Sequence, residues 1–112
     1  MDRIEQYQQI IQKHLEAEAK QPINLDFAVP RTLVLDKFAK RYILLARGWL
    51  KKKYVHYFVY HIEIIDGKVW IHEDRTDTGI ALELVRLGIP KADIVLGYFP
   101  KYAREMSDFG VM

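Results

Sequence analysis

VYHIEIIDGKVWIHEDRTDTGIALELVRLGIPKADIVLGYF, residues 59–99, is the stretch that decides the fold. Apolar residues alternate on both sides of Asp66-Gly67, and this dipeptide favours the type I′ turn of a β-hairpin. With these two residues in the turn, three cross-strand pairs follow: Ile65 with Lys68, Glu63 with Trp70, and His61 with His72. The last two pairs share one face of the sheet.

A helix and a short strand are predicted to follow this hairpin. Asp74 or Thr76 caps the helix, which we expect over residues 76–87. Gly88 ends it, because glycine readily takes the left-handed conformation found after a helix, and Pro90 prevents continuation. Residues 94–97 then form a short apolar strand, and residues 100–106 form one or two helical turns.

The chain before the hairpin predicts one helix and two strands. Gln21-Pro22 ends a helix over residues 2–19, whose apolar stripe repeats at three- and four-residue spacing: Ile4, Tyr7, Ile10, Ile11 and Leu15. A strand is expected over residues 27–36, with Pro30 indicating a sheet edge or a bulge. One side of that strand carries Phe27, Val29, Leu33 and Leu35. A second strand covers residues 42–47.

A long strand over residues 54–65 is rich in aromatic and β-branched residues, which places it in the centre of the sheet. Residues 48–53 form the basic tip of the hairpin before it. Simple alternation puts six residues of the long strand on one face: Tyr54, His56, Phe58, Tyr60, Ile62 and Ile64. These elements predict a single α+β domain over residues 1–112, with an antiparallel sheet of about four to five strands and two helices packed on it.

Composition excludes several classes of protein. The chain has 112 residues, of which 50% are hydrophobic and 29% charged, and no apolar run approaches the roughly 20 residues that span a bilayer. Its start lacks the basic and apolar regions of a signal peptide, so we expect a cytoplasmic protein with no membrane contact. The absence of cysteine excludes thiol catalysis, iron–sulfur clusters and cysteine zinc sites.

Positive charge is concentrated in one segment. Residues 31–53 carry eight basic and one acidic side chains, although the net charge of the chain is only +2. Five residues at its end predict contact with nucleic acid or with an acidic partner: Arg47, Trp49, Lys51, Lys52 and Lys53. Lysines at loop tips also keep strand edges apart and surfaces solvated, so a purely solvated tip is the competing interpretation.

Several pieces of the sequence, taken in order, resemble the XisI family, the fdxN-element excision controlling factors of filamentous cyanobacteria. They are EQYQQII near the start, HIEIIDGKVWI, DRTDTGIALELVRLGIPKADIVLGYF, and the proline and arginine of FPKYAREMSDF. The likeness covers essentially the whole chain. It departs from the family pattern at His72, where a glutamine is common, and at Tyr98-Phe99-Pro100, where the family has HPP.

The resemblance implies a small α+β protein that acts with a partner of the XisH type, beside a site-specific recombinase, to remove a DNA element. It implies neither catalytic residues nor a cofactor. We therefore expect a non-enzymatic controlling factor. Direct, weakly selective DNA binding through residues 31–53 is the first alternative, and a small metal-dependent enzyme is the second.

Two groups of residues carry the metal alternative. His61 and His72, facing each other with Glu63 beside them, have the residue types of a zinc site. Glu73, Asp74 and Asp77 have the carboxylates of a magnesium site. Both groups also have ordinary structural explanations, cross-strand stacking for the first and helix capping for the second, and we favour those.

The chain end predicts a partner interface. Aromatic residues gather there with one arginine, a combination that is enriched at interface hot spots: Tyr98, Phe99, Tyr102, Arg104 and Phe109. The same segment can instead tuck under its own sheet. An exposed sheet edge also makes a homodimer plausible.

Overall fold

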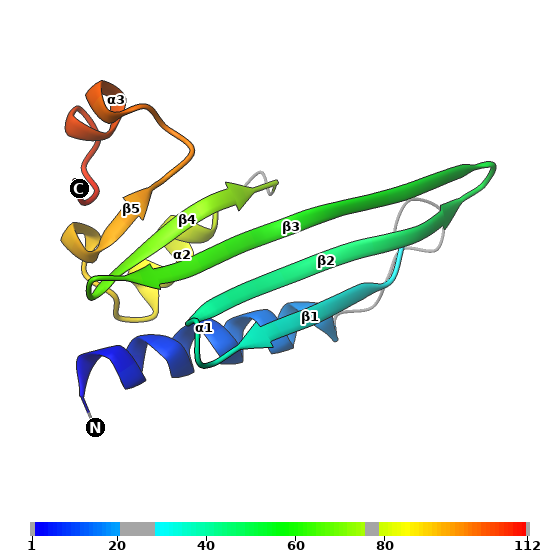
Figure 1. Ribbon diagram of the computed structural model, residues 1–112, viewed down its shortest axis with the longest axis horizontal. Coiled ribbons are helices and arrows are strands. Elements are labelled where there is room, and N and C mark those ends of the chain that lie inside the picture. Colours follow the sequence, from blue (N-terminus) through cyan, green and yellow to red (C-terminus); the bar gives the residue numbers. More distant parts are fainter. Residues whose placement is uncertain (1, 21–28, 76–78, 112) are drawn as a thin grey trace.

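The computed structural model describes residues 2–20, 29–75 and 79–111. Five strands form one sheet in the order β1-β2-β3-β4-β5, with α1 and α2 packed behind it in the view of Figure 1. The elements are α1 Arg3–Ala19, β1 Arg31–Asp36, β2 Arg41–Leu50, β3 Lys53–Ile65, β4 Lys68–Asp74, α2 Ile80–Arg86, the 3₁₀ turn η1 Lys91–Asp93, β5 Ile94–Leu96 and α3 Lys101–Glu105. The predicted α+β fold is confirmed.

The first helix lies on the sheet through the stripe that its sequence predicts. Asp2 caps α1 by accepting the backbone N–H of Glu5 at 2.8 Å, which satisfies one of the free donors at the helix start. Tyr7, Ile11 and Leu15 are buried against the strands. Gln21-Pro22, predicted to end this helix, lies outside the described residues.

The predicted β3–β4 hairpin forms as the dipeptide indicates, with φ of 51° at Asp66 and 78° at Gly67. Ile65 lies opposite Lys68 and Glu63 opposite Trp70, which confirms two of the three predicted pairs. The third pair is wrong, because the register shifts beyond Ile62 and places His61 opposite Glu73. His72 is the extra residue of this bulge.

A second bulge changes the faces of β3. Leu44 pairs with Tyr60 and Leu45 with Phe58, so Val59 has no partner on β2. Val59 and Tyr60 are consecutive and both buried, whereas strict alternation would expose one of them. The predicted face is therefore wrong: Tyr60, Ile62 and Ile64 face the helices, and Tyr54, His56 and Phe58 face the opposite side.

The bounds of β1 and β2 differ from the predicted ones. β2 runs to Leu50, beyond the predicted end at residue 47, so the β2–β3 turn consists of Lys51 and Lys52. β1 begins at Arg31 and forms a sheet edge, as Pro30 indicated. Leu33 and Leu35 pack against the core. Phe27 lies outside the described residues.

The segment after the β3–β4 hairpin returns the chain so that β5 Ile94–Leu96 runs in the same direction as β4. α2 begins at Ile80, whose backbone N–H donates to the Asp74 carboxylate at 2.7 Å, while the predicted helix start at Thr76 lies outside the described residues. β5 then pairs with β4 in parallel, which differs from the antiparallel arrangement expected throughout. A strand that returns after a crossover helix adds in parallel, and such a crossover connects β4 to β5.

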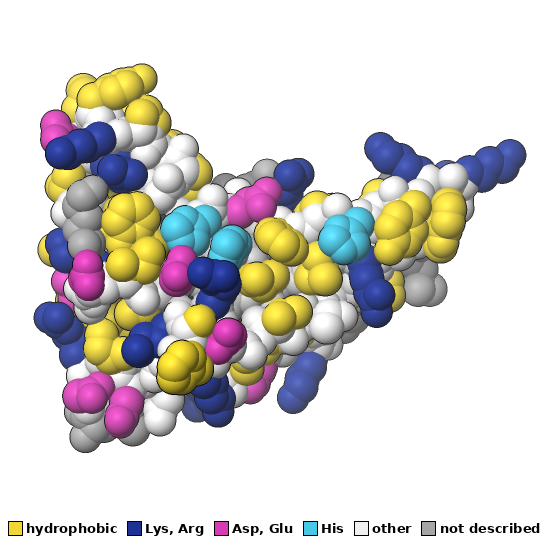
Figure 2. Space-filling view, in the orientation of Figure 1, with side chains coloured by type: hydrophobic (Ala, Val, Ile, Leu, Met, Phe, Trp, Pro, Cys, Tyr) yellow, Lys and Arg dark blue, Asp and Glu magenta, His cyan; other side chains and the backbone are white. Residues whose placement is uncertain are grey.

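The sheet therefore has two different faces. Its inner face, covered by α1 and α2, carries the core, including the fully buried Leu44, Ile62 and Ile71. No helix of the described residues covers the β2–β3 part of the other face, here called the outer face, which Figure 2 shows directly. Among the described residues, none of the helices has the length and apolar character needed to cross a membrane.

Candidate functional site

The β2–β3 hairpin extends away from the rest of the sheet (Figure 1) and carries a cluster of positive charge at its end (Figure 2). Lys51, Lys52 and Lys53 lie at the turn, here called the basic tip, and all three are exposed. Arg47 and Trp49 lie just behind it on the outer face. The five residues predicted to contact nucleic acid or an acidic partner are thus neighbours in the structure.

Aromatic and histidine rings follow the outer face from this tip toward β4. Each ring lies near the next at most steps, with centroid separations of 5.3 Å from Trp49 to Tyr54, 6.5 Å from Tyr54 to His56, 5.9 Å from Phe58 to His61 and 4.9 Å from His61 to His72. We call these six residues the ring row: Trp49, Tyr54, His56, Phe58, His61 and His72. The row ends at His72, and Trp70 lies next to that end at 6.1 Å from His72, with the Arg104 guanidinium 5.3 Å from the indole centroid.

An ion-paired cluster lies beside the His72 end of this row. Glu63 accepts hydrogen bonds from Arg41 at 3.1 Å and contacts the His72 Nε2 at 3.0 Å. Burial alone would raise the pKa of Glu63, but the hydrogen bonds and the charges of Arg41 and His72 together outweigh it and lower that pKa. Burial, together with the nearby His72 and Arg41, lowers the pKa of His61 and so favours its neutral form.

The two predicted metal groups have other contacts in the structure. Glu63 is held by Arg41 and His72, and Glu73 forms an ion pair with Arg75 at 2.9 Å. Asp74 accepts the Ile80 backbone N–H at the start of α2, although the N-cap residue itself is Gly79. Within residues 2–20, 29–75 and 79–111, no group of three or more His, Asp or Glu side chains is placed to hold a metal ion. Asp77 lies outside these ranges.

The predicted partner interface divides into exposed and packed residues. Tyr98 and Phe99 are exposed just before α3, and Tyr102 within α3 keeps 72% of its surface. Arg104 instead covers Trp70 and donates to the Phe99 carbonyl at 3.3 Å, and Phe109 packs against the core. An apolar surface therefore remains at α3 (Figure 2), while Arg104 and Phe109 hold the segment to the sheet.

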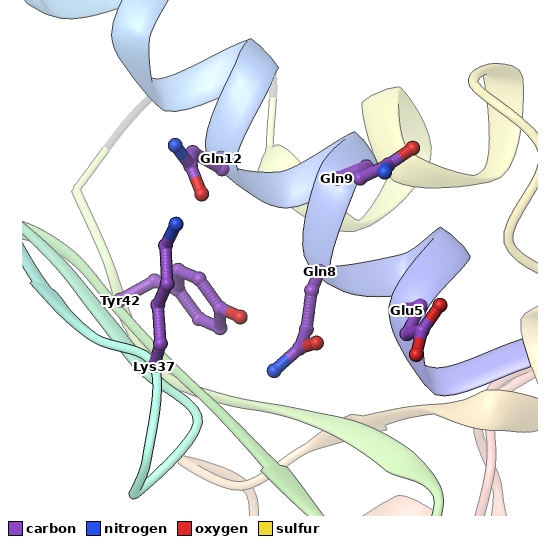
Figure 3. Close-up of a pocket in the computed structure, with 6 residues that line it drawn as sticks. All are labelled: Glu5, Gln8, Gln9, Gln12, Lys37 and Tyr42. Carbon is purple, nitrogen blue, oxygen red and sulfur yellow. The ribbon is translucent and has the colours of Figure 1, made fainter. Parts of the chain in front are cut away.

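A small polar groove lies on the opposite side of the sheet, between α1 and the β1–β2 turn (Figure 3). It encloses about 210 Å³ and is lined by Glu5, Gln8, Gln9, Gln12, Lys37 and Tyr42. Burial raises the pKa of the Tyr42 phenol, which keeps it protonated. Amide, ammonium, phenol and carboxylate groups line the groove and can exchange hydrogen bonds with a polar ligand, but none of them is a nucleophile paired with a base.

Comparison with known proteins assigns the family. The family model described as XisI protein matches residues 1–111. This chain belongs to the XisI family. No match was found among curated proteins.

Two solved structures from Anabaena variabilis ATCC 29413 are similar to the chain over its whole length. A XisI-like protein shares 35% identity with a TM-score of 0.88, over 97% of this chain and 99% of that chain. The fdxN element excision controlling factor XisI shares 31% identity with a TM-score of 0.82, over 99% of this chain and 100% of that one. The XisI-like fold inferred from the sequence is confirmed.

The ring row is the surface of this XisI family member that sequence reasoning missed. Simple alternation predicted that Phe58 and the buried Tyr60 share one face, because the types of the residues around Val59 do not indicate the bulge there. The available signal was the basic hairpin: Trp49 and Arg47 were already assigned to an exposed surface, and residues opposite them on β3 must share their face.

Proposed function

We propose that this protein is a non-enzymatic factor that controls site-specific excision of a DNA element. The observation that carries this proposal is its membership of the XisI family over residues 1–111, together with its full-length likeness to an fdxN element excision controlling factor. In this proposal the protein works in the cytoplasm. It acts through a partner of the XisH type, and the site-specific recombinase performs the DNA chemistry.

The contacts of the acidic and histidine residues support a binding role over a catalytic one. Glu63 and Glu73 are each held by an arginine, and Asp74 accepts the Ile80 backbone N–H at the start of α2. Charges that are neutralised in this way stabilise the fold and are poorly placed to activate water or a metal ion. The exposed surfaces of the described residues instead offer rings and cations, which are groups that bind.

The exposed α3 surface supports a protein partner. Tyr98, Phe99 and Tyr102 present aromatic area at the end of the molecule, and Met106 beside them keeps 85% of its surface. Aromatic residues on an anchored segment bind a partner with little loss of conformational freedom. We assign the contact with the XisH-type partner to this surface, with Tyr102 as its centre.

Co-expression with the XisH-type protein, followed by size-exclusion chromatography at high salt, tests this proposal. The two proteins should elute together, because an aromatic interface resists salt. Tyr102→Ala should separate them. Phe38→Ala, which removes another exposed aromatic ring from the β1–β2 turn, should leave the complex intact. Separate elution of the wild-type proteins contradicts the proposed partner.

Direct binding of duplex DNA is the second candidate function, and the basic tip is the observation that favours it. Lys51, Lys52 and Lys53 project from a hairpin that extends beyond the sheet, where phosphates can approach them (Figure 2). Replacing the three lysines with glutamate should abolish binding of duplex DNA at low salt and leave the fold unchanged. Equal binding by the wild type and this variant removes the candidate.

A further inference from the structure

The ring row on the outer face leaves aromatic rings exposed that do not pack in the core of the protein. Trp49 keeps 69% of its surface and Tyr54 keeps 49%, while Phe58 is half-buried. No helix of the described residues packs on these rings. Aromatic rings left in a line on an uncovered sheet indicate a binding surface, since the core on the other face is already complete.

We propose that the ring row binds single-stranded DNA, with bases stacked on the rings and phosphates held by Arg47 and the basic tip. Sheet faces that carry aromatic rings beside cations are the usual platforms for unpaired nucleotides, because every base has a π-face that can stack. The choice of DNA over RNA rests on the proposed function at a DNA element. Duplex DNA keeps its bases paired and stacked, so it cannot use the rings.

The charge of this face suits a polyanion. Arg47 lies directly opposite His56 in the register, so the cation borders the row, and the three lysines of the basic tip continue it. Two acidic residues border the row, Glu63 on β3 and Glu73 opposite His61 on β4. Contacts of Glu63 with Arg41 and His72, and of Glu73 with Arg75, offset these charges. A second copy of this chain, docked face to face, would bring the same cations against each other, which disfavours self-association here.

The row also has a suitable length. From Tyr54 to His61 the strand advances by seven residue steps, or about 23 Å at roughly 3.3 Å per step. Because each base stacks on one ring in this proposal, the six rings accommodate up to about six nucleotides. This falls within the roughly 4 to 16 nucleotides that sheet platforms of this kind cover. The Arg104 guanidinium over Trp70 closes the platform at the far end.

Fluorescence anisotropy with a labelled single strand of about 10 nucleotides tests the proposal, with the matching duplex and a single-stranded RNA of the same sequence as parallel probes. The single-stranded DNA should bind most tightly at low salt. Tyr54→Ala should weaken that binding by roughly 5- to 150-fold, the range measured for loss of one stacking ring. It should leave duplex binding by the basic tip unchanged. Tyr54→Phe should restore the affinity for the single strand.

Phe38→Ala is the matched control, because Phe38 is 96% exposed in the β1–β2 turn. It should bind single strands as the wild type does. Quenching of Trp49 fluorescence on binding provides a second measurement, and Trp49→Phe should remove it. Partner co-elution should survive Tyr54→Ala, so failure here is distinguishable from failure of the proposed function.

Three results would overturn the proposal. The first is equal affinity for single strand and duplex with no effect of Tyr54→Ala, which would mean that phosphates alone are bound. The second is tighter binding of the RNA, which would remove the DNA assignment. The third is a wild type that elutes as a dimer and becomes a monomer on Tyr54→Ala, which would make this face a contact between copies.

Discussion

At the scale of single residues, the close approach of the Ala92 and Ile94 backbone to Gly110 permits only glycine at position 110. Gly110 forms a bridge beside β5, and its backbone N–H donates to the Ile94 carbonyl at 2.7 Å. A Cβ atom at this position would lie 2.4 Å from the Ala92 carbonyl oxygen. Only glycine therefore fits at position 110 without a clash. The hydrogen bond from Gly110 to Ile94 holds the C-terminal segment against the sheet.

Gly110→Ala should lower the free energy of unfolding by about 1 to 3 kcal/mol, the usual cost of forcing atoms into a packed site. Urea denaturation measures the change. Val111→Ala, which trims the exposed neighbour, should stay within about 0.5 kcal/mol of the wild type. A Gly110→Ala variant as stable as the wild type would show that the segment does not pack as described.

His61 should make stability fall in mildly acidic solution. Its pKa is lowered from 6.5 in the folded protein, first by burial and then by His72 and Arg41. The unfolded chain therefore takes up the proton first, so the contribution of neutral His61 is present above about pH 6.5 and is lost as pH falls below it. The pKa of Glu63 is lowered from 4.5, so its own loss begins only in more acidic solution.

Thermal unfolding between about pH 7.5 and about pH 5.5 measures this effect. The wild type should lose more stability across that interval than His61→Gln, which has no imidazole to titrate. Parallel curves for the two proteins would remove His61 as the cause.

At the scale of elements, the hairpin and the first helix could be predicted from sequence because their signals are local. Asp66-Gly67 requires two positive φ angles, and Asp2 caps α1 through its own side chain. The bulges at Val59 and His72 could not be predicted from sequence, because the position of an extra residue in a strand depends on how side chains distant in the sequence pack. They moved Phe58 to the outer face and changed the partner of His61.

α2 has one buried face and one exposed face, which gives a matched test. Leu84 is fully buried in the core, whereas Leu82, two residues earlier, keeps 59% of its surface. Leu84→Ala should cost about 2 to 5 kcal/mol of unfolding free energy because it leaves a cavity. Leu82→Ala should cost less than about 0.5 kcal/mol. Similar losses in chemical denaturation would contradict the packing of this helix.

At the scale of the whole molecule, the fold separates its structural face from the surfaces for which we propose binding. The two helices complete the core on the inner face, while the basic tip, the ring row and the exposed α3 residues lie elsewhere (Figures 1 and 2). The sequence alone predicted the basic tip and the aromatic chain end, since their residues are adjacent along the chain. The ring row combines β2, β3 and β4, so it depended on the true register. A homodimer through an exposed sheet edge stays a prediction.

The excision yield of a reporter element tests the central claim most directly. A host that carries the element, the site-specific recombinase and the XisH-type partner is compared with and without this protein, and the excised product is quantified. Excision should require the protein and should fall with Tyr102→Ala, while Phe38→Ala should support the wild-type yield. Equal excision in the presence and absence of the protein would contradict its role as a controlling factor.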